Sequence, residues 1–219
     1  MADRTYLDLE SVISPSAPGC PPPTIEQYVR RAAIQACERT LAWRYEMDPL
    51  STATGTYEYA YDTPAFTEVC GVIHAARDGC TLPIKTQEWI HEMYPAWPDT
   101  TSTSRAQPLY MLQYNPDSFL LAPVPDDNVA ANYSIKLFLA LRPTPDSTYM
   151  DKTIFDELEV VITHLALKDL LSIPNKSWTD TKEAGRNAQE AAYRLSARRA
   201  KANLGVGRAT LSARMQPFA

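Results

Sequence analysis

Hydrophobic and polar residues follow two different periods along the chain, and the change of period divides it. Three segments have apolar residues three or four positions apart, the spacing that places them on one face of a helix. These segments cover residues 24–47, 151–173 and 179–204. Between the first and the second, over residues 50–148, the spacing falls to two, which is typical of half-buried strands. The pattern predicts helices toward both ends of the chain and strands in the middle.

The first helical segment follows a proline-rich stretch, SPSAPGCPPP, which cannot continue a helix or a central strand. Thr24 with Gln27 three residues later matches a capping box, which predicts a helix start at Thr24. The helix is expected to end near Met47, before Pro49. Its apolar stripe comprises Ile25, Tyr28, Val29, Ala32, Ala33, Ala36 and Leu41.

The second helical segment has the broadest apolar stripe and is expected at the centre of its domain. Asp151 or Thr153 can cap it. The third segment is rich in alanine, with Thr179 or Asp180 as its cap, and Gly205 is expected to end it. The stripe of the second segment comprises Ile154, Leu158, Val161, Ile162, Leu165 and Leu171.

Turn residues divide the middle region into hairpins. EVCGVIHAARDGCTLPI is expected to turn at Asp78-Gly79, and PLYMLQYNPDSFLLAPVP at Asn115-Pro116-Asp117. Between them, TQEWIHEMYPAWP predicts a short helix that begins at Thr86 and ends at Pro95. NYSIKLFLALRP is the clearest strand, with an apolar face made of Tyr133, Ile135, Leu137, Leu139 and Leu141.

These elements predict an α+β fold in which a helical bundle domain contains an inserted antiparallel β domain. Residues 24–48 and 150–205 are expected to form the helical domain together, because an amphipathic helix cannot bury its apolar face alone. Residues 49–149 would form the β domain. Residues 1–23 are expected to be an irregular N-terminal arm, and residues 206–219 a C-terminal tail that docks on a partner.

The connection SIPNKSWTD, residues 172–180, contains a tryptophan, Trp178, which is unusual in a short polar loop. Pro174 and Asn175 are expected to stop one helix. Trp178 lies at or just before the cap of the next helix, where an apolar side chain can pack on the first turn. We therefore expect Trp178 to be at least half buried and, with Pro174, to form a structural corner that sets the angle between the helices.

Charge is distributed unevenly along the chain. Its net charge is −5, but from Arg186 onward seven basic residues and one acidic residue give +6, so the first 185 residues carry −11. Such asymmetry indicates a basic arm with its own partner, or a solvated helix face. No apolar run is long enough to span a bilayer and the N-terminus lacks a secretory signal pattern, so no membrane partner is expected.

No motif predicts catalysis, a cofactor or a metal site, and the chain is not expected to be an enzyme. His91 and Glu92 resemble the start of a zinc-protease helix, but position 95, where the second histidine would stand, is Pro95. His74 and His164 are interpreted as partly buried histidines whose hydrogen bonds are satisfied.

Two further residue types have structural interpretations. The four cysteines show no CxxC spacing and are expected to be free thiols, with a bridge between Cys70 and Cys80 as the alternative. Tyr57, Tyr59 and Tyr61 alternate and could stack on bases, but their neighbours are acidic, which favours packing across strands.

Several segments occur in a distinctive order. RTLAWRYEM is followed by TATGTYEYAY, GCTLPIKTQEWIHEMYPAWP, PLYMLQYNPDSFLLAPVP, LALRPTPDS and LALKDLLSIPNKSWTDTKEA. This order, from about Thr24 to Gly205, resembles that of tailed-bacteriophage head-to-tail adaptor proteins, also called connector or tail-tubular-protein-A-like proteins. Its most specific pieces are the LP…W…YPAWP segment, the FLLAPVP strand and the PNKSW loop.

The resemblance implies a structural virion protein, made in the host cytoplasm and located at the head–tail interface. Such adaptors form rings, usually dodecamers, that join the portal protein to tail, nozzle or tail-tube proteins. DNA passes through the lumen without sequence-specific binding. The C-terminal segment docks on the portal, which on this chain implies a portal-binding role for Arg208, Leu211, Arg214, Met215 and Phe218.

Two other functions stay open. The chain could form a tail-completion or tail-terminator ring, or it could be a nucleic-acid-binding module that uses its Arg-rich C-terminal end. The acidity of the first 185 residues argues against the second, because phosphate attracts lysine and arginine.

Overall fold

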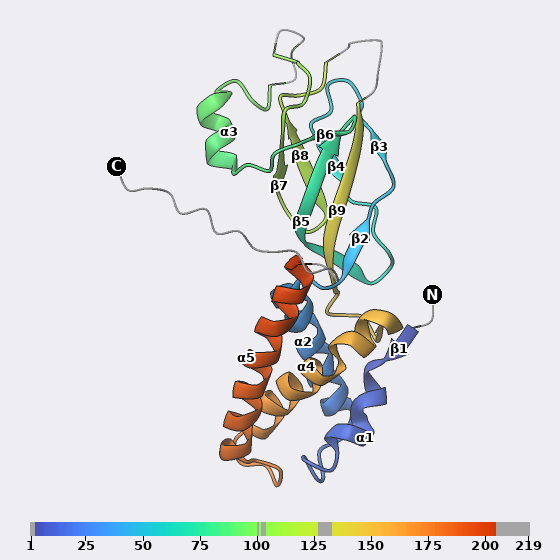
Figure 1. The fold of residues 1–219 in the computed structure, drawn as a ribbon, viewed down its shortest axis with the longest axis vertical. Helices are drawn as coiled ribbons and strands as arrows, with labels where there is room; N and C mark the ends of the chain where they lie inside the picture. The colour runs from blue at the N-terminus through green and yellow to red at the C-terminus, as the bar shows by residue number, and fades with distance from the viewer. Residues whose placement is uncertain (1–2, 100, 102–103, 127–132, 205–219) are drawn as a thin grey trace, which may run out of the picture.

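The computed structural model describes residues 3–99, 101, 104–126 and 133–204. Figure 1 shows a helical domain below a β domain, and together they give the molecule an elongated shape. The α+β fold that the sequence predicts is confirmed.

Three long helices form the helical domain: α2 (Pro22–Thr40), α4 (Lys152–Leu171) and α5 (Thr181–Leu204). Both α2 and α5 pack on α4, which is therefore the central helix. Asp151 caps α4 as expected, because its side chain accepts hydrogen bonds from the backbone N–H groups of Thr153 and Ile154. The predicted stripe of α4 faces the core, where Leu158 and Ile162 are fully buried.

Both predicted ends of α2 are wrong. The N-cap is Pro21, whose carbonyl accepts from the N–H groups of Thr24 and Ile25, and no side chain caps the helix. At the other end Leu41 adopts a left-handed conformation, with φ of 52°, and stops the helix six residues before Met47. The chain instead continues into β2 (Arg44–Glu46), which pairs with β9. Pairing with a distant strand overrides the helical spacing here.

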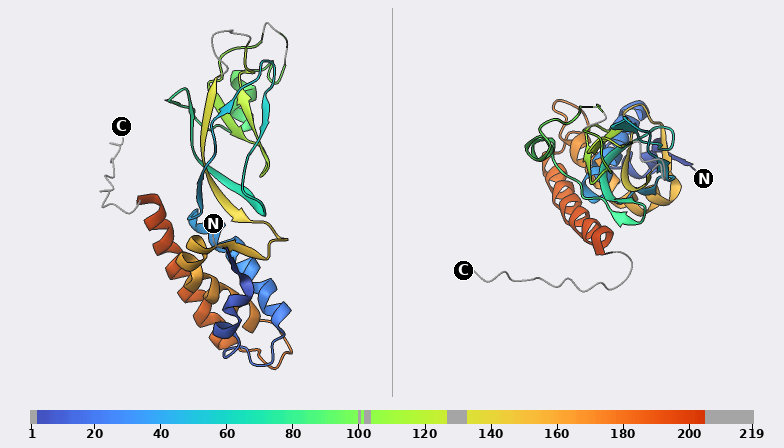
Figure 2. Two further views of the ribbon diagram at one scale, coloured as in Figure 1. Left: turned by 90° about the vertical axis from the view of Figure 1, so that its right-hand side faces the viewer. Right: turned by 90° about the horizontal axis from the view of Figure 1, so that it is seen from above.

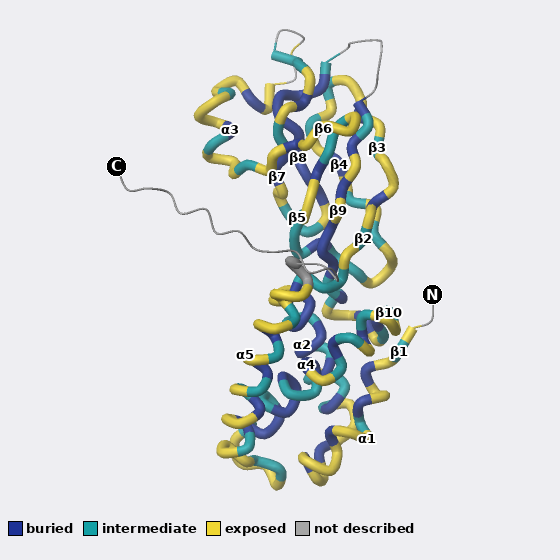
Figure 3. Tube along the Cα trace, in the orientation of Figure 1, coloured by how far each residue is buried: buried dark blue, intermediate teal, exposed yellow. Residues whose placement is uncertain are grey.

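The N-terminal arm is not irregular over residues 3–13. It forms β1 (Asp3–Thr5), the 3-10 helix η1 (Tyr6–Leu9) and the short helix α1 (Glu10–Ile13). β1 pairs with β10 (Tyr149–Asp151), directly before α4. The arm is ordered because Tyr6, Leu9 and Ile13 are fully buried in the core that α2 and α4 also line. Figure 3 shows this alternation of buried and exposed positions along the arm.

Two antiparallel sheets form the β domain. The order β2-β9-β5-β6, with β3 also paired to β9, makes the larger sheet, and the order β4-β8-β7 makes the smaller one. The strands not yet given are β3 (Leu50–Ser51), β4 (Glu58–Ala60), β5 (Thr67–Arg77), β6 (Cys80–Thr81), β7 (Tyr110–Gln113), β8 (Ser118–Ala122) and β9 (Ser134–Pro143).

The alternation predicted for β9 is confirmed, with its apolar face buried between the two sheets and Lys136 and Phe138 exposed. Both hairpin turns are also confirmed. Asp78 and Gly79, each with positive φ, join β5 to β6, and the second hairpin joins β7 to β8. The short helix is α3 (Gln87–Met93), which is capped by the side chain of Thr86.

The junction between the domains is packed and paired. β9 contacts α2 directly. Trp43 packs against both the helical core and the core between the sheets. Arg142, at the lower end of β9, forms ion pairs with Glu38 of α2 and Glu68 of β5. The lower end of the sheet is thus held against α2.

Tyr6 provides a test of the ordered arm through its pH dependence. Its Oη lies 2.9 Å from the hydroxyl of Ser147, and burial raises the pKa of Tyr6 to about 12, whereas the unfolded chain titrates near about 10. The stability that the neutral phenol contributes is therefore complete below about pH 10 and is lost as pH rises toward 12. Tyr6→Phe should cost about 1 kcal/mol at pH 7.

This difference should vanish or reverse at pH 11, because only the wild-type chain must keep the phenol of Tyr6 protonated. Urea unfolding of both proteins at pH 7 and pH 11 measures it. An equal difference at the two pH values would contradict the burial of Tyr6.

Candidate assembly surfaces

The corner between α4 and α5 is a compact loop with its own hydrogen bonds. The hydroxyl of Thr179 donates to the carbonyl of Ile173, and the backbone N–H of Lys176 donates to the Thr179 hydroxyl at 3.0 Å. Asn175 adopts a left-handed conformation, with φ of 58°. Asp180, not Thr179, caps α5, because its carboxylate accepts from the second and third N–H groups of the helix.

Trp178 is partly buried in this corner and packs against the helical core, whereas Pro174 is exposed. The indole Nε1 of Trp178 is buried and has no hydrogen-bond partner in the described part of the chain. The side chain therefore contributes by apolar packing. Its effect on the angle between the helices stays a prediction.

The histidines do not form a site. The Nδ1–H of His164 donates to the side-chain carbonyl of Asn187 at 2.7 Å, so His164 is satisfied between α4 and α5 as expected. His74 was expected to be partly buried, but it is exposed on the outer side of β5 beside Phe138. His91 is exposed, and its Nε2 atom lies 3.3 Å from the Nε2 atom of Gln87. Among the described residues, no cluster of His, Cys, Asp or Glu could hold a metal ion.

The cysteines are free thiols, and no bridge joins Cys70 to Cys80. Cys37 and Cys20 are buried, Cys70 is partly buried and Cys80 is exposed. Burial raises the pKa of Cys37 and raises that of Cys70 to about 11, so both are protonated at neutral pH. The packing predicted across strands is confirmed at Tyr59 of β4, which stacks on Phe119 opposite it in β8. Tyr57, which precedes β4, instead meets Trp97 edge-on outside the strands.

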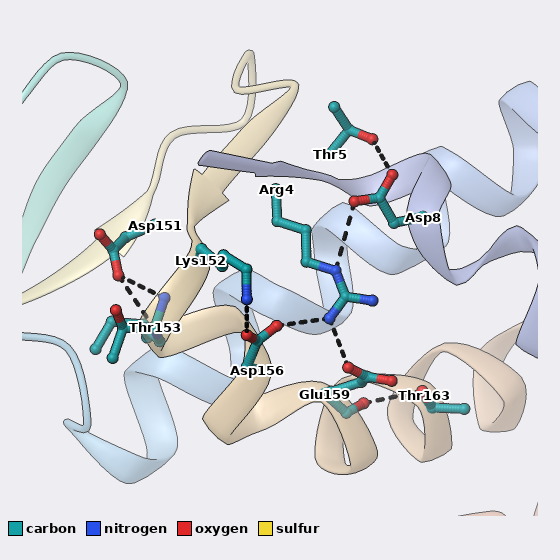
Figure 4. Close-up of polar contacts among 10 residues, drawn as sticks. Arg4, Thr5, Asp8, Asp151, Lys152, Thr153, Asp156, Glu159 and Thr163 are labelled. Atoms are coloured by element: carbon teal, nitrogen blue, oxygen red, sulfur yellow. Dashed lines mark hydrogen bonds and ion pairs between the residues drawn. The ribbon is translucent and has the colours of Figure 1, made fainter. Parts of the chain in front are cut away.

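A charged cluster ties the N-terminal arm to α4. The guanidinium of Arg4 lies 2.6 Å from both Asp156 and Glu159 of α4 and 3.4 Å from Asp8 (Figure 4). Lys152 also contacts Asp156. Hydrogen bonds from Lys152 and then from Arg4 lower the pKa of Asp156, and the bond to Glu159 helps to raise that of Arg4. Carboxylates remain in excess around these two cations.

Neither this cluster nor the junction at Arg142 was found from the sequence. Arg4 and Asp156 are separated by 152 positions, and Arg142 and Glu38 by 104. No local spacing connects residues so far apart, so only the folded chain shows them as neighbours.

The residues predicted to bind a portal lie outside the described residues. They are Arg208, Leu211, Arg214, Met215 and Phe218. α5, the element that precedes them, ends at the end of the helical domain nearest the β domain (Figure 1).

No described helix is both long and apolar enough to cross a membrane. The chain belongs to the SU10 adaptor protein family, whose model matches residues 4–218. This is a family of structural phage proteins and not a known enzyme family. No curated protein sequence matched the chain.

Trp178 can be tested without disturbing the rest of the corner. Trp178→Ala should lower the free energy of unfolding by about 2 kcal/mol, because it removes a partly buried ring from the helical core. Trp178→Phe should cost less than about 1 kcal/mol, since the lost indole N–H has no partner to leave unpaired. Chemical denaturation of the two variants makes the comparison. Equal losses would show that the indole N–H matters, and no loss in either would show that the ring is not part of the core.

Proposed function

We propose that this protein forms a ring that joins the portal of the capsid to the tail and continues the DNA channel. The observation that carries the proposal is the family match over residues 4–218, which includes both domains and the C-terminal segment. A dodecamer is the stoichiometry implied by the resemblance to head-to-tail adaptors. The protein would then be a virion component at the head–tail interface.

The distribution of charge supports passage of DNA without retention. The first 185 residues have a net charge of −11. They include the whole β domain and all of the helical domain except most of α5. Lysine and arginine bind the DNA phosphates regardless of base sequence. A lumen lined with acidic residues would therefore not bind the DNA that passes through it. A lumen lined with arginine would contradict this part of the proposal.

The C-terminal segment is proposed to dock on the portal. Residues 206–219 contain Arg208 and Arg214, no acidic residue, and the apolar side chains of Leu211, Met215 and Phe218. A short basic and apolar segment of this kind can become ordered on a partner surface, where its apolar residues are buried and its arginines pair with acids.

Truncation after Gly205 tests the docking role. The shortened protein should keep the circular dichroism spectrum and unfolding midpoint of the full chain, because the described residues of all three core clusters lie before 205. It should no longer co-sediment with purified portal rings. The full chain with Arg208 and Arg214 replaced by Gln is the matched control for charge alone and should bind more weakly than wild type.

Normal attachment of the truncated protein would contradict the docking role. If the full chain co-purified with tail tubes and not with portals, the result would instead favour a tail-completion or tail-terminator ring.

A further inference from the structure

Two surfaces of the helical domain lie on opposite sides of it. One is the α5 face, the exposed residues of α5. The other is the N-terminal face, formed by β1, η1, α1, β10 and the first two turns of α4. Figure 1 shows α5 at the left edge and β1 and α1 at the right, and the view from above in Figure 2 also separates them.

The α5 face is basic, with small residues between its cations. Cations outnumber acids on it: its side chains include Lys182, Arg186, Arg194, Arg198, Arg199 and Lys201 and the two carboxylates Glu183 and Glu190, which pair with Arg186 and Arg194. Within the described residues, no ion pair joins Lys182 or Arg199. Tyr193 projects from the middle of the face and is 71% exposed. The other exposed positions include Gly185, Ala192, Ser196, Ala197 and Ala200, which allow a second surface to approach the helix closely.

The N-terminal face is acidic. Its cations are Arg4 and Lys152, and its carboxylates are Asp3, Asp8, Glu10, Asp151, Asp156 and Glu159. Glu157, also in the second turn of α4, lies on the other side of the helix and pairs with Arg198 and Lys201 of α5. In the register of β1 with β10, Asp3 stands directly opposite Asp151. Like charges in this position repel each other and destabilise the strand pair. A cation brought by a partner would relieve that repulsion.

Apolar surface accompanies these carboxylates. Asp3 and Asp151 lie on a groove of about 430 Å³ whose lining includes Trp43, Tyr149 and Phe66. Arg44 also lines it. Phe66 is 49% exposed, contacts Tyr149 edge-on and is held at a φ of 59°, a strained conformation for a bulky residue.

Two apolar residues of the arm itself are also exposed on this side of the domain. Leu7 of η1 is 42% exposed and Val12 of α1 is 48% exposed. The N-terminal face therefore offers an acidic and apolar surface, which complements the basic α5 face with its exposed tyrosine.

We propose that neighbouring copies of this chain join in the ring through the α5 face of one copy and the N-terminal face of the next. The occupant of the acidic groove and its surroundings is a second copy of the chain. The inference rests on the proposed ring and specifies which surfaces close it.

The geometry agrees with what a ring requires. Copies related by rotation meet through two different surfaces on opposite sides of each subunit, so each contact is heterologous and the complementary charges of one chain suffice for the whole ring. Charge complementarity of this kind fixes the register of the neighbours and opposes incorrect pairings. Tyrosine and arginine are also among the residue types enriched at the energetic centre of interfaces.

Charge reversal tests the contact. Lys182→Glu/Arg186→Glu/Arg199→Glu leaves the α5 face with more carboxylates than cations, and Asp3→Lys/Asp8→Lys/Glu10→Lys leaves the N-terminal face with five cations and three carboxylates. Each variant alone should sediment as monomer under conditions in which the wild-type protein forms rings, because like charges then meet. A chain that carries both sets of substitutions should form rings again, since the charges are once more complementary.

The matched control is Glu88→Lys/Glu92→Lys, which reverses two exposed acids on α3 in the β domain and should leave the rings intact. Circular dichroism verifies that every variant is folded. Should a reversed chain unfold, Tyr193→Ala provides the same test, since this side chain is largely exposed in the isolated chain and its removal should weaken the ring without destabilising the subunit.

The outcomes separate the contact from the ring itself. A wild-type protein that stays monomeric at every concentration, with and without portal, would overturn the proposed ring and this contact together. Wild-type rings that persist in the α5 variant and in Tyr193→Ala would overturn the contact alone. Loss of rings in both reversed variants without recovery in the combined chain would show that the two faces do not meet each other.

Discussion

Burial of the apolar face of α4 is the constraint on which the rest of the helical domain depends. The helix has apolar residues around much of its circumference, so one neighbour cannot cover it. α2, α5 and the N-terminal arm each cover a part, and none of them has a comparable face to bury elsewhere. The arm is ordered for this reason, although its sequence contains no long periodic segment: Tyr6 and Phe155 complete the same core, with ring centroids 6.3 Å apart.

The β domain is attached to this core through a small set of contacts at one end. Trp43 belongs to both cores, and Arg142 holds α2 and β5 to the base of β9. These contacts fix the orientation of the β domain relative to the helical domain. This arrangement also leaves both sides of the helical domain uncovered by the two sheets of the β domain, as Figure 2 shows, and these sides are where the complementary charges lie.

Local signals account for what could be predicted from the sequence. The alternation of β9, the Asp78-Gly79 turn and the Asp151 cap each depend on a few adjacent residues, and each is confirmed. The end of α2 could not be predicted in this way, because residues 44–46 pair with β9 almost a hundred positions later. The ion pairs of Arg142 with Glu38 and of Arg4 with Asp156 could not be predicted for the same reason, since these partners are far apart in the sequence. For the two proposed contact surfaces, the uneven charge of the sequence indicated a basic segment near the C-terminus. Only the fold shows that an acidic surface lies on the opposite side of the helical domain.

The separation of α2 from α4 along the chain affects how the protein is made. α2 ends at Thr40 and α4 begins at Lys152, so the ribosome completes the whole β domain before the partner of α2 exists. At bacterial rates of synthesis this interval is roughly 5–20 s. During it, the alanine-rich face of α2 can pack only on the N-terminal arm, and the sheets can fold first, once their strands are complete. The small side chains of Ala32, Ala33 and Ala36, which are buried in the folded chain, expose little apolar surface before α4 is synthesised.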